Sequence, residues 1–495
     1  MRLGRPARRI VNGALLIAAL ALSGCMVGPK YKVPSAPAAP EFKELNPSAD
    51  SSAFKENSNW QTAKPQDTIP RGDWWTVFHD GGLNALEPQV AAANQTLKAA
   101  DANLRAARAN LRVQNSQKYP TFGINPFLGG ERDSANQPYF NAASANNGEG
   151  DLYLPLQLNY EVDLWGAVRR SITAAREESQ ATAADRQSVL LSLQAELATD
   201  YFELRAADAQ QKLLNDTVGQ YAEAVRITQD RYLGGVAVKS DVTQAETQLE
   251  DAKVSASDVA IARAQYEHAI ANLIGKPPAD FSLPPAPLPL TDEPPVIPPG
   301  FPSQLLERRP DIAAAERNVA AANEQIGIAR AAYFPTLNLG ATAGQEGTAA
   351  TNLFRSSSFI YALGPTIGET FFDGGRRRGL SEQARANYDG TVATYRQTVL
   401  TAYQQVEDNL VALRVLTHEQ TQQREATASA QESERIFNNR YVGGVDTYLQ
   451  VITAQTSALN NERNDIDILR RRMDSSVLLI KVLGGGWDRT QLPPQ

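Results

Sequence analysis

The sequence predicts a mixed α and β fold in which two copies of one unit each contribute a β-hairpin and very long helices. The first observation is a duplication, because RYLGGV at 231–236 recurs as RYVGGV at 440–445. The same constant offset relates residues 166–275 to residues 375–484, without a gap. The second observation is a strict alternation of apolar and polar side chains with a period of two residues. The third is a set of apolar stripes at helical spacing that are longer than any globular core. Together they indicate two equivalent structural units.

The N-terminus predicts export. Four arginines precede an apolar run over residues 10–22, which is too short to span a membrane but suits the core of a signal peptide, residues 1–24. Leu22-Ser23-Gly24-Cys25 follows and resembles the bacterial lipobox, so Cys25 is the expected lipidation site. Cys25 is the one cysteine of the chain, which excludes an intramolecular disulfide. Met26 after it favours the outer membrane, and an ordinary signal peptide with a chance cysteine is the alternative.

Charge and composition disfavour several function classes. Removal of residues 1–24 takes away four arginines and no acidic residue, so 48 basic residues become 44 against 55 acidic ones, a net charge of −11. Nucleic acid is therefore an unexpected partner. His79, His268 and His418 stand far apart, and no Gly-x-Ser-x-Gly or Walker-type loop occurs. We expect no enzymatic activity, no cofactor and no metal site.

Composition also divides the chain. Residues 25–72 are rich in Pro, Ser, Ala and Asn and predict a tether, and residues 277–302 predict a stiff, proline-rich linker. Helices are expected at about 83–118, before Pro120, and at about 303–332, before Pro335. The resulting division is a first unit at 73–276, a second unit at 303–487 and a tail at 488–495.

The segments after these two helices predict β-strands. Residues 152–163 have apolar side chains at every even position, and 359–371 repeat the pattern less cleanly. Partner strands are expected at 121–131 and 336–345. Their length suits tilted transmembrane strands, although a soluble hairpin packed on helices would show the same alternation. Four strands cannot close a barrel in lipid, so several chains must share one barrel. Periodicity alone does not decide between eight strands from two chains and twelve strands from three.

The helices that follow the strands are unusually long. Residues 171–232 form an unbroken heptad-like stripe of roughly 90 Å at 1.5 Å per residue. Paired glycines then break the helix, and a second stripe continues to Gly275. These lengths suit a cylinder of uniform height, whereas an antiparallel coiled-coil bundle without a lumen would also explain the stripes.

The combination resembles the TolC-like outer-membrane factors, in particular the lipidated NodT-type efflux lipoproteins. The resemblance covers about residues 72–487, rests on the two glycine turns, DLWG at 163–166 and FDGG at 372–375, and is strongest at 445–455. It implies a homotrimer in the cell outer membrane, with a 12-stranded transmembrane β-barrel (four strands per chain) continuous with a long periplasmic α-helical barrel. It further implies an exit channel for drugs or other small toxic compounds, served by a periplasmic adaptor and an inner-membrane RND-type transporter.

The resemblance also places candidate site residues at the glycine turns. Asp241 matches the position of a gate carboxylate and Tyr441 that of a tyrosine on the facing turn, and Asp446 stands where well-known relatives carry an arginine. An ordinary helix N-cap role for Asp241 is the alternative. The expected adaptor-docking tip comprises Gly234, Gly235, Val236, Gly443, Gly444 and Val445, for which a plain helical-hairpin turn is the competing interpretation.

Two other functions share part of this pattern. An outer-membrane duct of a type I protein secretion system would have the same features throughout. A structural envelope lipoprotein that forms a coiled coil without a pore would explain the helices but would not need alternating strands.

Overall fold

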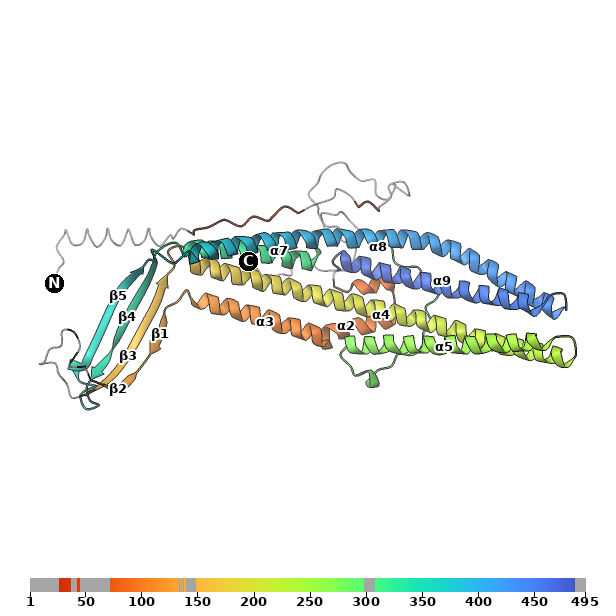
Figure 1. Cartoon of the computed structure of the whole chain (residues 1–495), viewed down its shortest axis with the longest axis horizontal. Helices are drawn as coiled ribbons and strands as arrows, with labels where there is room; N and C mark the ends of the chain where they lie inside the picture. The colour runs from red at the N-terminus through yellow and green to blue at the C-terminus, as the bar shows by residue number, and fades with distance from the viewer. Residues whose placement is uncertain are drawn as a thin grey trace.

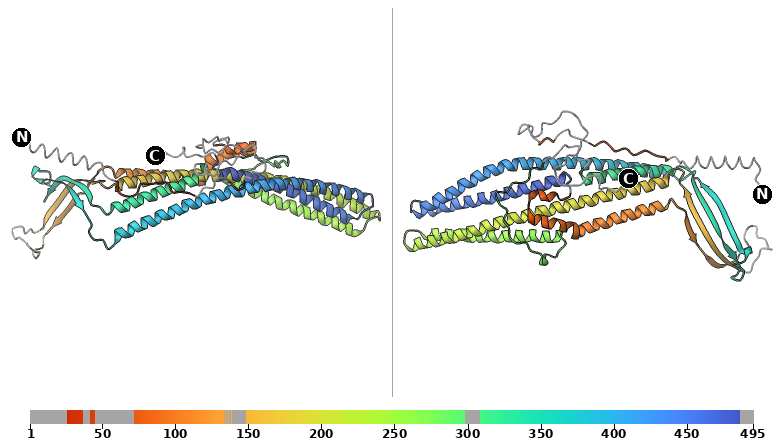
Figure 2. Two further views of the ribbon diagram at one scale, coloured as in Figure 1. Left: turned by 90° about the horizontal axis from the view of Figure 1, so that it is seen from above. Right: turned by 180° about the vertical axis from the view of Figure 1, so that it is seen from behind.

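The computed structural model describes residues 26–36, 42–44, 72–132, 134, 136, 138, 148–297 and 308–485. Within these residues the molecule is long and thin and mostly helical, with an antiparallel sheet at one end and two helix turns at the other (Figure 1). Figure 2 shows the sheet inclined to the helix axes from two further sides. The predicted signal peptide, Cys25 and the tail 488–495 lie outside the described residues.

Two long helices of equal length organise the molecule, and each is followed by a shorter partner. Helices α4 and α8 have 67 residues each, and α5 and α9 have 35 each. We call α4 with α5 the first helical hairpin and α8 with α9 the second. The helices are α2 (Gly81–Ala93), α3 (Gln95–Ser116), α4 (Ala167–Leu233), α5 (Lys239–Leu273), α7 (Pro310–Ala331), α8 (Arg376–Val442) and α9 (Tyr448–Val482), with 3-10 turns η1 (Trp74–Phe78), η3 (Pro278–Asp280) and η5 (Ser356–Ser358).

Glycines set the ends of both long helices. Gly166 and Gly375 cap the N-termini of α4 and α8 with φ of 84° and 90°, in the left-handed region that side chains with a Cβ rarely adopt. At the other ends, Gly235 and Gly444 have φ of 73° and 77°. The predicted long helix at 171–232 is thus confirmed, extended by a few residues at its start.

The helix expected at 83–118 is in fact two helices, because Asn94 interrupts it. The Asn94 side chain accepts a hydrogen bond from the Leu97 amide (3.0 Å) at the start of α3 and donates one to the Leu273 carbonyl (2.8 Å) at the end of α5. One buried amide therefore satisfies the termini of two different helices. The break coincides with a contact to the end of α5, a helix that is remote from Asn94 in sequence.

The sheet is antiparallel, with the order β1-β3-β4-β5 and β2 also paired to β3. Its strands are β1 (Thr121–Ile124), β2 (Phe127–Glu131), β3 (Glu149–Val162), β4 (Thr336–Gly347) and β5 (Phe359–Gly368). The expected strand 121–131 is divided between β1 and β2, on either side of Pro126, which has no amide hydrogen to donate. The other three strands lie where alternation predicts them.

The register gives the sheet two different faces. Leu156 of β3 lies opposite Ile124 of β1 and Ala343 of β4, which in turn faces Tyr361 of β5. The neighbouring position Gln157 pairs with Gly123 and Thr342 on the other face. Opposite residues of an antiparallel pair share a face, so one face is mainly apolar and the other mainly small and polar, with Phe127, Tyr153 and Ile360 as apolar exceptions.

The main hydrophobic core lies midway along the molecule, where η1, α2, α4, α5 and α9 meet. Leu83, Leu197 and Leu469 are fully buried there, and each such side chain contributes roughly 1.5–3 kcal/mol. This core holds the two helical hairpins together at their base. Among the described helices, none has both the length and the apolar character that crossing a membrane requires.

Candidate functional site at the helix turns

The two glycine turns lie together at the end of the molecule farthest from the sheet (Figure 1). Each turn closes in the same way: the Val236 amide donates to the Arg231 carbonyl (3.0 Å), and the Val445 amide donates to the Arg440 carbonyl (2.9 Å). Val236 and Val445 are both 68% exposed. The predicted tip residues thus form two adjacent loops with unpaired apolar side chains.

Tyr441 lies between the two helical hairpins. Its side chain is 4% exposed and packs with Ala245 of the first hairpin and with Tyr448 and Val451 of the second. The Tyr441 and Tyr448 rings are 5.1 Å apart between centroids. Burial, followed by the nearby carboxylate of Asp241, raises the pKa of Tyr441. The structure therefore brings Tyr441 and Asp241 together.

Asp241 occupies the third residue of α5, in its first turn. Val238 is the N-cap of this helix and makes no side-chain cap hydrogen bond. The N-cap position considered for Asp241 is therefore taken by another residue. Near a helix N-terminus the carboxylate still interacts favourably with the helix dipole, so Asp241 stabilises α5 as well as facing Tyr441.

Asp446 has a different partner. Its carboxylate forms an ion pair with Arg440 of the same turn, in which Arg440 Nη2 lies 3.3 Å from Asp446 Oδ1. Asp446 is thus bound within the second hairpin and is not joined to Asp241 or Tyr441 by any hydrogen bond among the described residues.

Arg231 is the residue at this site that sequence reasoning missed. Its guanidinium carbon lies 4.8 Å from the centroid of the Tyr441 ring, and its Nη1 donates to the Val442 carbonyl (3.1 Å). The signal was present in the duplicated turn: position 237 is Ala where the second copy has Asp446, so Arg231 has no carboxylate in its own turn.

A second constellation lies near the sheet, where residues 26–36 run along the helices. Arg170, which is 2% exposed, donates to the carbonyls of Val27 (2.8 Å) and Pro29 (3.2 Å) and forms an ion pair with Glu324 (2.6 Å). A Cβ on Gly28 would lie 2.7 Å from Gly327 Cα, so only glycine fits there.

This contact fixes the start of the described chain next to the sheet. The Val27 amide donates to the Trp165 carbonyl (3.1 Å), at the junction between β3 and α4. Trp165 also stacks on Phe334 with 4.6 Å between ring centroids. Residue 26, the neighbour of the predicted lipidation site, therefore lies at the end of the strands.

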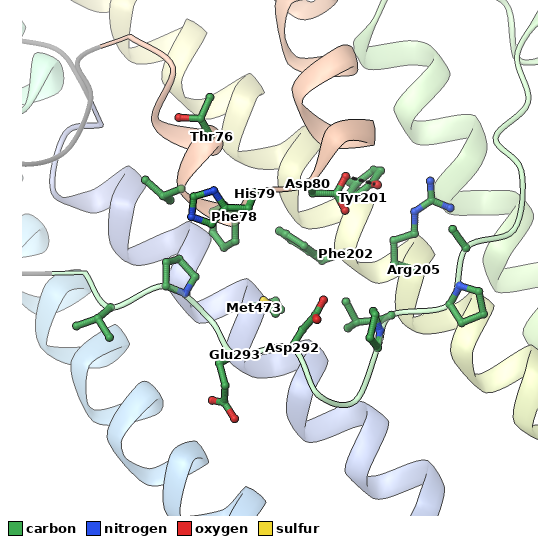
Figure 3. Close-up of a pocket in the computed structure, with 17 residues that line it drawn as sticks. Thr76, Phe78, His79, Asp80, Tyr201, Phe202, Arg205, Asp292, Glu293 and Met473 are labelled. Atoms are coloured by element: carbon green, nitrogen blue, oxygen red, sulfur yellow. Dashed lines mark hydrogen bonds between the residues drawn. The ribbon is translucent and has the colours of Figure 1, made fainter.

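A cavity at mid-length is lined by none of the predicted site residues. Its volume is about 900 Å³, and it opens between η1, α4, α9 and the proline-rich linker. Asp80 accepts a hydrogen bond from the Tyr201 hydroxyl (2.7 Å), and Asp292 approaches from the linker (Figure 3). Burial and the charge of Asp80 raise the pKa of Asp292. No group of His, Cys, Asp and Glu suited to a metal ion occurs in the described part of the chain.

Comparison with known proteins identifies what the chain resembles. The family described as outer membrane efflux protein matches residues 86–276 and 301–485. The chain is 31% identical to the probable efflux pump outer membrane protein TtgC of Pseudomonas putida over 481 residues, which covers 96% of this chain and 95% of TtgC. It is also 31% identical to outer membrane protein OprJ of Pseudomonas aeruginosa, with the same coverage of both chains.

Solved structures of outer-membrane channels have the same fold as this chain. The outer-membrane channel OprN superimposes with a TM-score of 0.83 at 27% identity, covering 94% of this chain and 100% of OprN. The open state of the Neisseria gonorrhoeae MtrE outer membrane channel superimposes with a TM-score of 0.77 at 26% identity, covering 94% of this chain and 99% of MtrE.

Proposed function

Because this chain belongs to the outer membrane efflux protein family, we propose that three copies form the exit channel of a tripartite efflux pump. The protein is an outer-membrane component of an efflux pump. In the proposed assembly it passes drugs or other small toxic compounds from a periplasmic adaptor and an inner-membrane RND-type transporter to the exterior. The observation that carries the proposal is the 31% identity to efflux outer membrane proteins over 96% of the chain.

The sheet supports assembly of several chains. Its outer strands, β1 with β2 on one side and β5 on the other, each have an edge that pairs with no strand of the described segments. Unpaired backbone groups are costly in lipid, so these edges must pair with strands of other copies. With β1 and β2 counted as one interrupted strand, each chain has four, and three copies would give twelve strands. The mainly apolar face would lie toward lipid and the mainly small and polar face toward the lumen. Each chain would contribute one hairpin from unit 73–276 and one from unit 303–487.

The N-terminal contacts support a lipid anchor at Cys25. Val27 is bound to Trp165 and Arg170 at the end of the strands. In the proposed assembly, acyl chains on the cysteine that precedes Met26 in the sequence would enter the bilayer beside the barrel. The lipid and the barrel would then hold the protein in the membrane together.

The helix turns support a gate at the opposite end of the channel. Asp241 and Tyr441 lie where the two hairpins converge, and Asp446 lies beside them in the second turn, where its ion pair with Arg440 stays within one hairpin. Polar and aromatic contacts between the hairpins are worth roughly 0.5–1.5 kcal/mol each, so several such contacts must break together when the channel opens. The exposed Val236 and Val445 would dock the adaptor.

Complementation tests this function. Expressed in cells that lack their own efflux outer membrane protein, the chain should restore resistance to toxic compounds only when the matching adaptor and transporter are present. A photo-reactive residue at Val236 or Val445 should capture the adaptor, and one at Leu154 on β3 should not. Secretion of a protein without restored resistance would instead favour a type I secretion duct, and absence of conductance in planar bilayers would favour a spacer.

A further inference from the structure

The two helical hairpins carry an arginine and a tyrosine at equivalent positions but use them differently. Arg231 and Tyr232 precede the first glycine turn, and Arg440 and Tyr441 precede the second. Tyr232 is 42% exposed, with the Lys239 amine 5.8 Å from its ring centroid, whereas Tyr441 is 4% exposed. The asymmetry shows that only one of the two tyrosines lies between the hairpins.

The same asymmetry separates the arginines. Arg440 is occupied by Asp446 within its own turn, six residues later in sequence. The equivalent position in the first turn is Ala237, which has no charge to offer. Arg231 is therefore free to extend to the second hairpin.

From this geometry we infer that Arg231 is the positioning residue that ties the first hairpin to the second and holds Tyr441 in the closed arrangement. Its guanidinium covers the Tyr441 ring at 4.8 Å and donates to the Val442 carbonyl at 3.1 Å. This inference rests on the proposed gate and names a contact within one protomer that keeps it closed.

The acceptor of this hydrogen bond explains why an arginine suits the position. Val442 is the last residue of α8, and its carbonyl is one of those left without an intrahelical partner at a helix C-terminus. A cation near this end also interacts favourably with the helix dipole. The planar guanidinium can lie on the ring and direct an N–H at the carbonyl at once, which a lysine amine cannot do as well.

Aromatic contacts complete the arrangement. The hydroxyl of Tyr441 is buried, and among the described residues no partner meets the usual hydrogen-bond geometry. The contact with Arg231 is made chiefly by the face of the ring. Tyr448 of α9, in the same hairpin as Tyr441, packs against the Tyr441 ring with 5.1 Å between the ring centroids.

Two substitutions test the role of Arg231 from opposite directions. Arg231→Ala removes the guanidinium, and Ala237→Asp keeps it but supplies a carboxylate in its own turn, as Asp446 does for Arg440. Arg440→Ala is the matched control, because it removes the equivalent arginine from the other turn. Arg231→Lys should rescue the Arg231→Ala defect only partly.

The distance between the hairpins can be read with a disulfide. Gln248 of α5 and Thr456 of α9 already touch, with Gln248 Nε2 3.4 Å from Thr456 Oγ1. Cysteines at these two positions, in a chain that also carries Cys25→Ser, should cross-link readily in the trimer. Resting conductance in planar bilayers supplies the second measurement.

We expect Arg231→Ala and Ala237→Asp each to lower the cross-linking rate and to raise resting conductance, both about tenfold, since a cation–π contact and a hydrogen bond together shift an equilibrium by roughly this factor. Arg440→Ala should change either quantity by less than about twofold. Equal effects of Arg231→Ala and Arg440→Ala, or no effect of Ala237→Asp, would overturn the inference. A wild-type chain that conducts no ions would contradict the proposed channel, while the cross-linking rates would still decide the role of Arg231.

Discussion

Glu87 allows a prediction whose magnitude follows from its surroundings. The residue lies on the buried face of α2, between Leu83 and Val90 along that face, and is 0% exposed. Neither carboxyl oxygen has a hydrogen-bond partner in the part of the chain that the structure describes. Burial raises the pKa of Glu87 from 4.5 to about 9. Assembly with other protomers does not change this environment, because the Glu87 side chain is already fully buried within one chain.

The sign of the pH effect follows from linkage. Between pH 4.5 and about 9 the folded chain keeps the Glu87 proton and the unfolded chain has lost it. The unfolded state thus binds fewer protons, so stability falls as pH rises through this window and is constant below and above it. Each pH unit is worth about 1.4 kcal/mol, so the loss at pH 7.5 relative to pH 4.5 is about 4 kcal/mol.

The variant Glu87→Met should abolish this loss, because it fills the space with an apolar side chain that does not ionise. With about 2.1 cal/mol/K of unfolding entropy per residue, a 495-residue chain gains roughly 4 °C in thermal midpoint from 4 kcal/mol. The measurement is the thermal unfolding of purified trimer at pH 5 and at pH 8. Glu246→Gln, at an exposed position on α5, is the control and should follow the wild type at both pH values.

The reasoning would be refuted if wild type and Glu87→Met changed in parallel between pH 5 and pH 8. That result would mean that the carboxyl group is hydrated or paired in the folded state.

Further predictions concern the sheet, the anchor and the gate. Leu156→Arg should cost roughly 2–4 kcal/mol and lower trimer yield if the residue faces the lipid midplane, whereas Gln157→Arg should be tolerated; equal yields would contradict the two-faced barrel. Labelled palmitate should mark the wild type and not Cys25→Ser, which should still assemble in the membrane; label on the variant would exclude Cys25 as the lipidation site. Asp241→Ala combined with Tyr441→Phe should raise resting conductance and sensitise cells to large antibiotics, and unchanged conductance in a confirmed trimer would leave both residues with packing roles alone.

Much of the fold was readable from the sequence because it depends on local patterns. The ends of the long helices at the paired glycines follow from the left-handed conformation that glycine permits, which Gly235 and Gly444 adopt in the structure. Alternation over 152–163 predicted the strand and its two faces, since neighbouring side chains of a strand point to opposite sides. The family resemblance and the outer-membrane efflux function were likewise correctly predicted, because they depend on the order and spacing of such elements.

Contacts between remote segments were decided only by the tertiary structure. Asn94 divides the helix expected at 83–118 because α5 ends beside it, and Arg170 binds residues 27–29, which precede it by about 140 positions. Periodicity cannot distinguish Arg231 from Arg440, since both occupy the same place in the same turn. Their partners differ because one turn contains Asp446 and the other Ala237, and because folding places the Tyr441 ring within reach of Arg231 alone. A sequence pattern determines which residues share a face of one element, whereas the partner of a side chain depends on which other elements pack against that face.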